Sequence, residues 1–432
     1  MTTATTQEPT AEREGAEPEI VTFGCRLNAY ESEVMLRHAR EQGLGDAVIV
    51  NTCAVTGEAE KQARQAIRRA HRDHPDRRIV VAGCAAQLHP DQFADMPGVE
   101  RVLGNQAKLR PESFAPEPAQ RVVVDDIMEA RETASHLVEA FETRTRAFVQ
   151  IQQGCDHRCT FCIIPYARGN NRSVPVGELV KQVRAMVADG VGEVVLTGVD
   201  ITAYGDDLPG RPRLGELCRR LLTNVPDLPR LRLSSVDPAE LDDEVFALLA
   251  SEPRLMPQLH LSLQAGDDLI LKRMKRRHLV ADAERTVERA RACRPDVVFG
   301  ADLIAGFPTE DADAHARTLD TLDRLGLTHL HVFPYDERPG TPAARMPQVP
   351  KATRKARARE LRERGHAAVR RFLDACVGHE ASVLLEEADA TGRLKGRTEH
   401  FAPARVDSGR PGEIARVRVT GAADGHLVAA RL

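Results

Sequence analysis

Three cysteines lie close together near the middle of the chain, where Cys155, Cys159 and Cys162 follow a strand-like run in the order C-x3-C-x2-C. A loop this short wraps its three thiols around one metal centre. Thiolates are soft ligands that suit zinc or an iron–sulfur cluster. Structural zinc normally takes four protein ligands, and [4Fe–4S] clusters are commonly held by four cysteines. A cluster held by only three leaves one iron open, as a reactive site requires.

His157 lies inside this loop and offers a fourth ligand in principle. We interpret it as a solvated loop histidine, with metal ligation as the alternative.

A second set of cysteines is spread along the first part of the chain. Cys25, Cys53 and Cys84 each end a strand-like run, in IVTFGC, VIVNTC and VVAGC. The carboxyl ends of parallel strands meet at one edge of a sheet, where ligands bind in open α/β sheets. We therefore expect these three thiols to converge on a second metal centre, with three buried, inert cysteines as the alternative.

The elements that position these thiols follow a regular alternation of strands and helices. Strand-like runs EIVTFG, AVIVNT and RIVVAG are each followed by a helical stretch, which predicts a parallel α/β sheet that closes near residue 127. Six more strand candidates follow, AFVQIQ, EVVLTG, RLRLSS, QLHLSL, VVFGADLI and HLHVFP. Six such units fit an incomplete parallel barrel, whose chemistry belongs at the carboxyl ends of the strands.

The end of the chain changes character. Short alternating runs separated by Gly and Asp turns, such as EIARVRVTG and HLVAARL, predict a small all-β barrel or sandwich. The expected fold class is therefore α/β, with a parallel α/β domain, a partial (β/α)6 barrel and a small C-terminal β barrel.

Bulk properties exclude several classes of protein. Nine cysteines is an odd number, which excludes a complete disulfide framework, and the formal net charge of −4 gives no global sign of nucleic-acid binding. The sequence has no run of about 20 apolar residues, so no membrane span is predicted. The acidic start MTTATTQEPTAEREGAEPE does not resemble a signal peptide. A cytoplasmic location is expected, where clustered cysteines more often bind metal or take part in catalysis.

The two cysteine sets together carry a family resemblance. GCDHRCTFCIIPYARG resembles the motif of radical S-adenosylmethionine enzymes, and FGCRLN, NTCAVT and AGCAAQ upstream resemble the methylthiotransferases within that superfamily. The resemblance implies two [4Fe–4S] clusters, one held by Cys25, Cys53 and Cys84 and one by the three loop cysteines. It also implies that S-adenosylmethionine binds the open iron and that reductive cleavage yields a 5′-deoxyadenosyl radical.

Further segments resemble the family at the strand ends of the barrel. They are LTGVDITAYG, RLSSVDP, HLSLQAGDD, DLIAGFPTE and FPYDERPGTPAARM, and the near-site residues expected to meet the cofactor are Gly198, Asp200, Ser234, Gln264 and Asp302. For each of these the alternative is a turn or capping residue.

The tail resembles the RNA-binding TRAM domain, through LKGRTEHFAPARV. Its candidate RNA-binding residues are Arg393, Lys395, Arg397 and Phe401, which offer phosphate and stacking contacts, although relatives more often have asparagine in place of His400. Two basic segments, 271–278 and 351–372, can also face phosphates, or can be solvated helix faces. The remaining Cys218, Cys293 and Cys376 are interpreted as buried or incidental.

Composition predicts a disordered tail (1–17) and a charged linker (128–146). The resemblance names the other three parts as an N-terminal methylthiotransferase domain (18–127), a radical core domain (147–372) and a TRAM domain (373–432). It implies addition of a methylthio group to C2 of N6-threonylcarbamoyladenosine at position 37 of tRNA, with an electron donor such as flavodoxin or ferredoxin as a partner. The alternatives are methylthiolation of N6-isopentenyladenosine or of a ribosomal-protein aspartate. Outside the family, a non-catalytic RNA-binding protein with clusters and a two-cluster electron carrier stay open.

Overall fold

A computed structural model of the chain describes residues 17–117, 120–130, 145–390 and 392–432. Residues 1–16 of the predicted disordered tail (1–17) and most of the predicted linker (128–146) lie outside these residues. The described chain forms two compact units that divide between Asp125 and Asp126, with Val55–Gly57 grouped with the second. Among the described residues, no helix is long and apolar enough to cross a membrane.

The first unit is a parallel sheet of five strands in the order β1-β2-β3-β4-β5. The strands are β1 (Glu19–Thr22), β2 (Ala47–Thr52), β3 (Arg78–Gly83), β4 (Val99–Leu103) and β5 (Val122–Val123). The helical elements are α1 (Arg26–Glu41), α2 (Gly57–Asp73), α3 (Cys84–Leu88), α4 (Pro90–Ala94), η1 (Ala107–Leu109) and η2 (Pro111–Phe114). Every residue of β2 is buried, as expected for a parallel strand covered on both faces. The sequence predicted the first three strands and missed β4 and β5.

The second unit begins with an incomplete parallel barrel, so the predicted fold class is confirmed. Its strands are β6 (Arg146–Gln150), β9 (Glu193–Thr197), β10 (Leu231–Leu233), β11 (Ser235–Val236), β12 (Gln258–Gln264), β13 (Val298–Ala305) and β14 (Leu327–Pro334). They pair in two parallel sheets, β6-β9-β10 and β11-β12-β13-β14. Since β10 and β11 are two pieces of one predicted strand, all six predicted strands are present.

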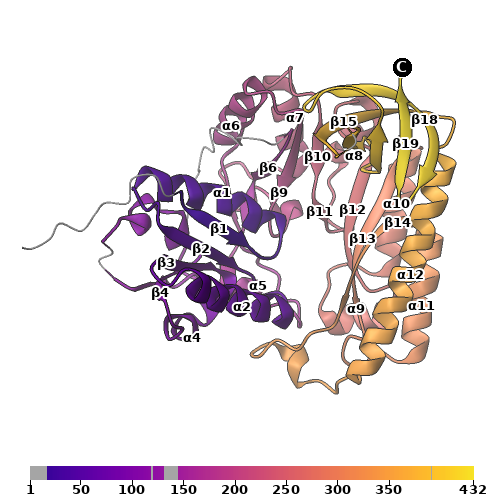
Figure 1. The fold of residues 1–432 in the computed structure, drawn as a ribbon. Helices are drawn as coiled ribbons and strands as arrows, with labels where there is room; N and C mark the ends of the chain where they lie inside the picture. Colours follow the sequence, from indigo (N-terminus) through magenta and orange to yellow (C-terminus); the bar gives the residue numbers. More distant parts are fainter. Residues whose placement is uncertain (1–16, 118–119, 131–144, 391) are drawn as a thin grey trace, which may run out of the picture. The chain divides into compact units, whose positions relative to one another are not determined.

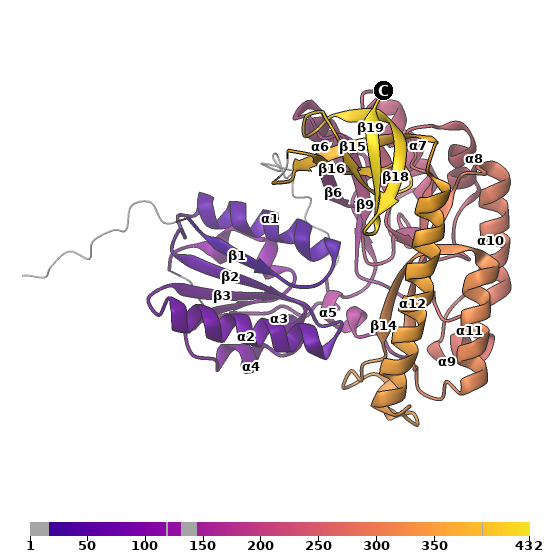
Figure 2. The same cartoon turned by 45° about the vertical axis from the view of Figure 1, so that its right-hand side comes forward.

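Helical elements lie between and after the strands, and the longer helices cover the outer face of the sheets. They are α5 (Ile164–Arg168), α6 (Val176–Ala188), η3 (Ile201–Ala203), α7 (Leu214–Asn224), α8 (Asp243–Ser251), α9 (Asp268–Met274), α10 (Val280–Cys293), α11 (Ala312–Leu325), η4 (Pro342–Arg345) and α12 (Lys351–Ala375). Figures 1 and 2 show α10, α11 and α12 side by side on this outer face. The core lies between sheet and helices and takes alternate strand residues, among them Leu261, Ala301 and Leu303.

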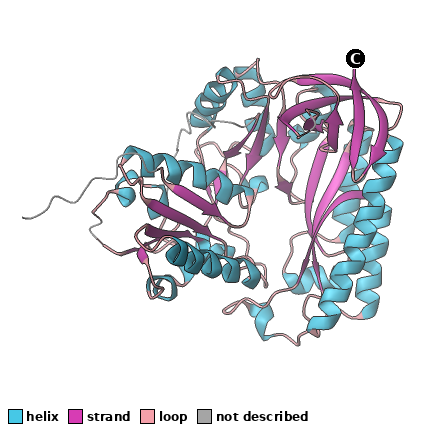
Figure 3. Cartoon of the chain, viewed as in Figure 1, coloured by secondary structure: helices cyan, strands magenta, loops and turns pink. Residues whose placement is uncertain are grey.

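The tail forms a closed five-stranded barrel, in the order β15-β16-β17-β19-β18. Its strands are β15 (Glu380–Ala388), β16 (Leu394–Thr398), β17 (Pro403–Val406), β18 (Ile414–Ala423) and β19 (His426–Arg431). Figure 3 shows these strands as the last strand-rich part of the chain, beyond the long helix α12. Closure pairs every strand on both edges, which allows so short a segment to bury its own core.

Candidate functional site

The three cysteines of the first unit lie at the carboxyl ends of three neighbouring strands. Cys25 follows β1 and is the N-cap residue of α1, Cys53 directly follows β2, and Cys84 directly follows β3. The register pairs Thr22 with Asn51 and Thr52 with Gly83, so the three strand ends are adjacent. The sheet therefore brings the three segments that carry Cys25, Cys53 and Cys84 to one edge, as the sequence predicted.

Side chains around this edge hold the cysteine segments together. The Asn28 amide donates to the backbone oxygens of Phe23 and Thr52 at 2.7 and 3.0 Å, and the Asn51 amide donates to the Asn28 oxygen at 3.0 Å. A Cβ atom at Gly24 would lie 2.7 Å from the Cys53 sulfur, which shows how closely the segment before Cys25 approaches Cys53. The Asn105 amide lies 3.5 Å from the Cys84 sulfur.

The second cysteine set lies in a loop that begins after the short strand β7 (Gln152–Gln153). This strand pairs antiparallel with β8 (Arg172–Ser173), so the two ends of the loop are tied together. The Cys155 amide donates to the Gly169 oxygen at 3.0 Å, and the Cys162 amide donates to the Cys159 oxygen at 3.1 Å. The loop therefore has a backbone scaffold of its own.

Gly154 allows the tight turn before Cys155, and its replacement gives a testable prediction. Its φ is +69°, and a Cβ atom there would lie 1.8 Å from the Asn170 oxygen. Gly154→Ala is therefore expected to displace the loop and to lower the iron retained per protein severalfold. The measurement is iron content and visible absorbance after anaerobic purification. Gly177→Ala on α6, where a Cβ atom meets nothing within 4 Å, is the control and should retain wild-type iron.

The donor set fits an iron–sulfur cluster. All nine cysteines are free thiols. Burial raises the pKa of Cys155 and raises that of Cys162 to about 12, so these sulfurs need a metal to become thiolates. The Arg276 guanidinium lies 3.5 Å from the Cys159 sulfur and donates to Asp237 at 2.8 Å. A buried cation beside the loop offsets the negative charge that thiolates bring.

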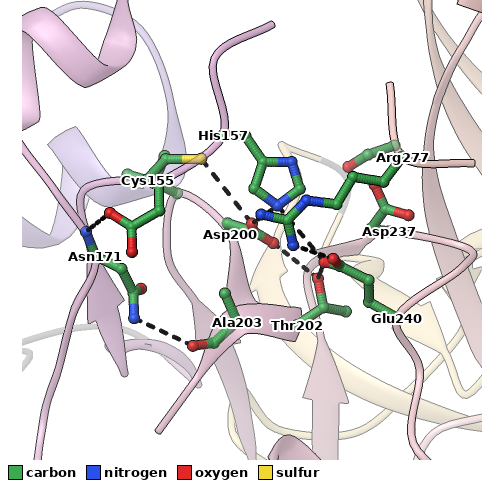
Figure 4. A network of polar contacts seen from close by, with 12 residues as sticks. Cys155, His157, Asn171, Asp200, Thr202, Ala203, Asp237, Glu240 and Arg277 are labelled. Carbon is green, nitrogen blue, oxygen red and sulfur yellow. Dashed lines mark hydrogen bonds and ion pairs between the residues drawn. The ribbon is translucent and has the colours of Figure 1, made fainter. Parts of the chain in front are cut away.

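A buried polar group lies directly beside Cys155 (Figure 4). Nε2 of His157 lies 3.2 Å from an Asp200 oxygen and 3.7 Å from a Glu240 oxygen, and the His157 side chain is only 6% exposed. Glu240 also pairs with Arg277, and the Cys155 sulfur lies 3.9 Å from Asp200. The interpretation of His157 as a solvated loop residue is therefore wrong, because the two carboxylates draw the ring inward.

Gly198 and Asp200 belong to one backbone segment that Gln152 holds in place. The amides of Val199 and Asp200 both donate to the Gln152 side-chain oxygen at 2.9 Å. A Cβ atom at Gly198 would lie 2.8 Å from that same oxygen. This close approach explains the glycine and brings Asp200 next to the cysteine loop.

The other three near-site candidates do not join this segment. The Ser234 amide donates to the Leu196 oxygen, and Gln264 ends β12 at an irregularity in register, with a φ of +68°. Asp302 lies three residues before the carboxyl end of β13. It accepts hydrogen bonds from His260, His331 and Ser235. The structure thus places Gly198 and Asp200 beside the cysteine loop and gives Asp302 a separate set of partners within the sheet.

Sequence reasoning missed His260, His331, Gln152 and Arg276. A signal for the histidines was present, because LHLSL and THLHVF alternate polar with apolar residues. Parallel strands buried on both faces normally read as continuous apolar runs. Alternation in a barrel strand therefore indicates a polar inner face. No comparable local signal marks Arg276, because its partners lie far away in the sequence.

Two of the four candidate RNA-binding residues, Arg397 and Phe401, are half-buried and pack against other side chains of the protein. Phe401 lies between guanidiniums, with the central carbons of Arg146, Arg232 and Arg397 at 5.2, 5.0 and 4.7 Å from its ring centroid. Arg393 and Lys395, by contrast, are exposed, and Lys395 pairs with Glu387. Phe401 and Arg397 thus have a packing role at the amino-terminal ends of the barrel strands.

The two basic segments are partly neutralised by intramolecular contacts. In 271–278, Arg276 and Arg277 pair with Asp237 and Glu240. In α12, the arginines that make ion pairs within the protein are Arg354, Arg357, Arg359 and Arg364, whereas Lys355, Arg370 and Arg371 are exposed. Cys218 is buried on α7, Cys293 ends α10 and Cys376 follows α12, as expected for residues without a shared site.

Comparisons with known proteins agree with this division of the chain. The family described as the radical SAM superfamily matches residues 149–322, and the one described as uncharacterized protein family UPF0004 matches residues 18–104. A solved radical S-adenosylmethionine methyltransferase, TsrM from Kitasatospora setae, with cobalamin and a [4Fe–4S] cluster bound, has a TM-score of 0.51 at 15% identity. It covers 76% of this chain and 74% of its own, and shows a shared fold.

Curated relatives match nearly the whole chain. The threonylcarbamoyladenosine tRNA methylthiotransferase MtaB of Rickettsia prowazekii is 49% identical over 96% of this chain and 97% of its own length. The protein of the same name from Thermotoga maritima is 35% identical over 95% of this chain and 96% of its own. The tRNA-2-methylthio-N(6)-dimethylallyladenosine synthase of Cereibacter sphaeroides is also 35% identical, over 96% of this chain and 98% of its own.

Proposed function

Because the chain belongs to the radical S-adenosylmethionine methylthiotransferase family, we propose that it adds a methylthio group to C2 of N6-threonylcarbamoyladenosine at position 37 of tRNA. The observation that carries the proposal is the pairing of three free thiols at adjacent strand ends with three more in one closed loop. The relative of 49% identity, named for the threonylcarbamoyl substrate, favours this branch.

The cofactors are S-adenosylmethionine and [4Fe–4S] clusters, as in other members of the family. We assign one cluster to Cys25, Cys53 and Cys84 and the other to Cys155, Cys159 and Cys162. When bound, cluster and S-adenosylmethionine supply a carbon radical strong enough to remove hydrogen from a purine C–H bond, which no side-chain base can deprotonate.

The remaining residues of the site hold the backbone in place and balance the charges around the cysteine loop. Gln152 fixes the 198–200 backbone, so Asp200 keeps its place beside Cys155. Arg277 pairs with Glu240. One Asp200 oxygen accepts from the Thr202 hydroxyl at 2.7 Å, and we assign the other, which lies beside His157 and Cys155, to an N–H donor such as the amino group of S-adenosylmethionine. Arg276 offsets the thiolate charge near Cys159. Gly198, Ser234 and Gln264 stay in the proposal as strand-end residues near the cofactor.

The partners we propose are the anticodon stem-loop of tRNA and an electron donor such as flavodoxin or ferredoxin, in the cytoplasm. We assign phosphate contacts to the exposed residues Arg393 and Lys395. Arg397 and Phe401 would support RNA binding from within the packed junction instead. The domain boundaries proposed are 18–127, 147–372 and 373–432.

One second candidate deserves a direct test, because relatives named for the dimethylallyladenosine substrate are 35% identical over nearly the whole chain. It would place the methylthio group on N6-isopentenyladenosine. Methylthiolation of a ribosomal-protein aspartate and non-catalytic RNA binding have no specific contact in their favour.

Mass spectrometry of digested tRNA distinguishes these candidates. Cells without the gene are expected to lose 2-methylthio-N6-threonylcarbamoyladenosine, because the two cysteine sets that we assign to the clusters are then absent. The intact gene should restore the nucleoside, and a Cys53→Ala copy should not. Loss of the isopentenyl product instead would move the assignment to the second candidate, and an unchanged nucleoside profile would contradict tRNA as the substrate.

A further inference from the structure

A row of polar side chains crosses the sheet β11-β12-β13-β14, with one residue from each strand. Ser235, His260, Asp302 and His331 occupy the row, and the register pairs Ser235 with His260 and Asp302 with His331. One Asp302 oxygen accepts from Nε2 of His260 at 3.0 Å and from Nδ1 of His331 at 3.1 Å. The other oxygen accepts from the Ser235 hydroxyl at 3.1 Å. The row is therefore one connected hydrogen-bonded unit.

The row lies on the inner face of the barrel. Side chains alternate between the two faces of a strand, and the neighbours Leu261, Ala301 and Val332 belong to the core between sheet and helices. The row must then face the opposite side. Gly300 makes room on that side, because a Cβ atom there would lie 2.4 Å from Nδ1 of His260.

Part of the row can be reached from outside the protein. The His260 side chain is 9% exposed, whereas Asp302 is 22% and His331 is 54% exposed. His260 and Asp302 therefore form the buried part of the row, and His331 is the member that a ligand can contact directly. Two residues further along β14 on the same face, Phe333 is 46% exposed, so its ring is open to contact with a ligand.

The depth of the row matches the shape of the proposed substrate. Asp302 and His331 each lie three residues before the end of their strand, which is about 10 Å below the edge at 3.3 Å per residue. A purine with C2 directed at that edge would extend its N6 substituent down the barrel wall. Phe333 lies between the edge and the row, where a flipped base can stack on its ring.

The row has the polarity of a hydrogen-bonding site. Burial raises the pKa of Asp302, but hydrogen bonds from His260 and His331 outweigh it and hold the pKa far below its usual range. An ionised carboxylate only accepts, so both facing ring nitrogens carry hydrogen. Nε2 of His331 is then left to accept from a hydroxyl or N–H group of a ligand. An apolar substituent would desolvate these groups without replacing their partners.

We propose that Ser235, His260, Asp302 and His331 recognise a polar, hydroxyl- and carboxylate-bearing N6 substituent on the target adenosine, with His331 in direct contact. The inference rests on the proposed function, whose substrate carries such a group. It makes His331 a specificity-determining residue and gives Asp302 a positioning role, in place of the cofactor contact expected from the sequence.

The test measures binding of the cluster-loaded protein to three anticodon stem-loop RNAs that differ only at N6 of adenosine 37. One carries the threonylcarbamoyl group, one the isopentenyl group and one no substituent. The wild type is expected to bind the first most tightly. His331→Leu should lose about ten- to hundredfold in affinity for the threonylcarbamoyl RNA and keep its affinity for the unmodified RNA. His426→Leu, a partly exposed histidine on the β18–β19 hairpin, is the control.

The binding results test the inference, and product formation tests the proposed function, so the two can fail independently. Equal binding of all three RNAs by the wild type, or an unchanged preference in His331→Leu, would overturn the inference. A tighter complex with the isopentenyl RNA would overturn it too. If a His331-dependent preference is found but no 2-methylthio product forms, the proposed function fails and the inference stands. If product forms without that preference, the inference alone fails.

Discussion

Replacing Cys159 with alanine is expected to reduce formation of 5′-deoxyadenosine and of the 2-methylthio nucleoside to background. Cys159 is 8% exposed and lies 3.5 Å from the Arg276 guanidinium, so its loss removes one of three thiolates and leaves a buried cation without its sulfur partner. The measurement is mass spectrometry of both products after reaction of the purified protein with S-adenosylmethionine, a reductant and substrate RNA.

The control for this variant is Cys293→Ala, a cysteine at the end of α10 that we assign no role. It should retain wild-type product formation and iron content. Retention of deoxyadenosine formation by Cys159→Ala would contradict the assignment of the loop cysteines. The same result in Cys155→Ala or Cys162→Ala would do so equally.

The second large effect concerns Glu193, a fully buried carboxylate between the barrel and the C-terminal domain. It accepts from Arg146 at 2.7 Å and from Arg232 at 2.8 and 3.1 Å, and lies 3.6 Å from Arg230. Glu193→Gln leaves the buried guanidiniums of Arg232 and Arg230 without the carboxylate they pair with, whereas Arg146 keeps Glu386. We expect the free energy of unfolding to fall by about 3–5 kcal/mol, measured by guanidinium chloride denaturation.

Stability at Glu193 is also expected to depend on pH. Burial raises the pKa of Glu193, but Arg232, Arg146 and Arg230 outweigh it and hold the pKa at about 2. An unfolded glutamate has a pKa of about 4.3, so the stabilisation is complete above that pH and is lost as pH falls towards 2. The difference between wild type and Glu193→Gln should therefore shrink below about pH 4.

An exposed ion pair supplies the matched control. Glu284 lies 2.9 Å from Arg324, and both side chains are at least a third exposed. Glu284→Gln should change the free energy of unfolding by less than about 1 kcal/mol. If Glu193→Gln were no more destabilising than this control, the ion pairs of Glu193 with Arg146, Arg230 and Arg232 would not stabilise the protein as predicted.

Recognition of the cysteine sets needed only local sequence. Cys155, Cys159 and Cys162 are joined by so few bonds that they must share one loop. Cys25, Cys53 and Cys84 each follow a strand, and parallel pairing brings such ends to one edge in any register that keeps the sheet. The six barrel strands were recognised for the same reason, because each is a continuous apolar or alternating run.

Tertiary structure decided which polar residues meet. His260, Asp302 and His331 join through the register of three strands that are far apart in sequence, and a shift of one residue would turn any of them to the other face. His157 is buried because Asp200 and Glu240 come to it from later loops. Phe401 resembles an RNA-stacking residue from its neighbours in sequence, yet three arginines from the two domains surround its ring.

The division has one physical cause. The positions of the strands follow from the alternation of apolar and polar residues, and the closeness of the loop thiols follows from their short separation in the chain. Both can therefore be predicted from the amino-acid sequence. The partner of a charged or aromatic side chain depends instead on packing between elements far apart in the chain. That packing pairs Asp302 with two histidines and Glu193 with three arginines, and neither set of partners can be read from the residues next to these carboxylates in the sequence.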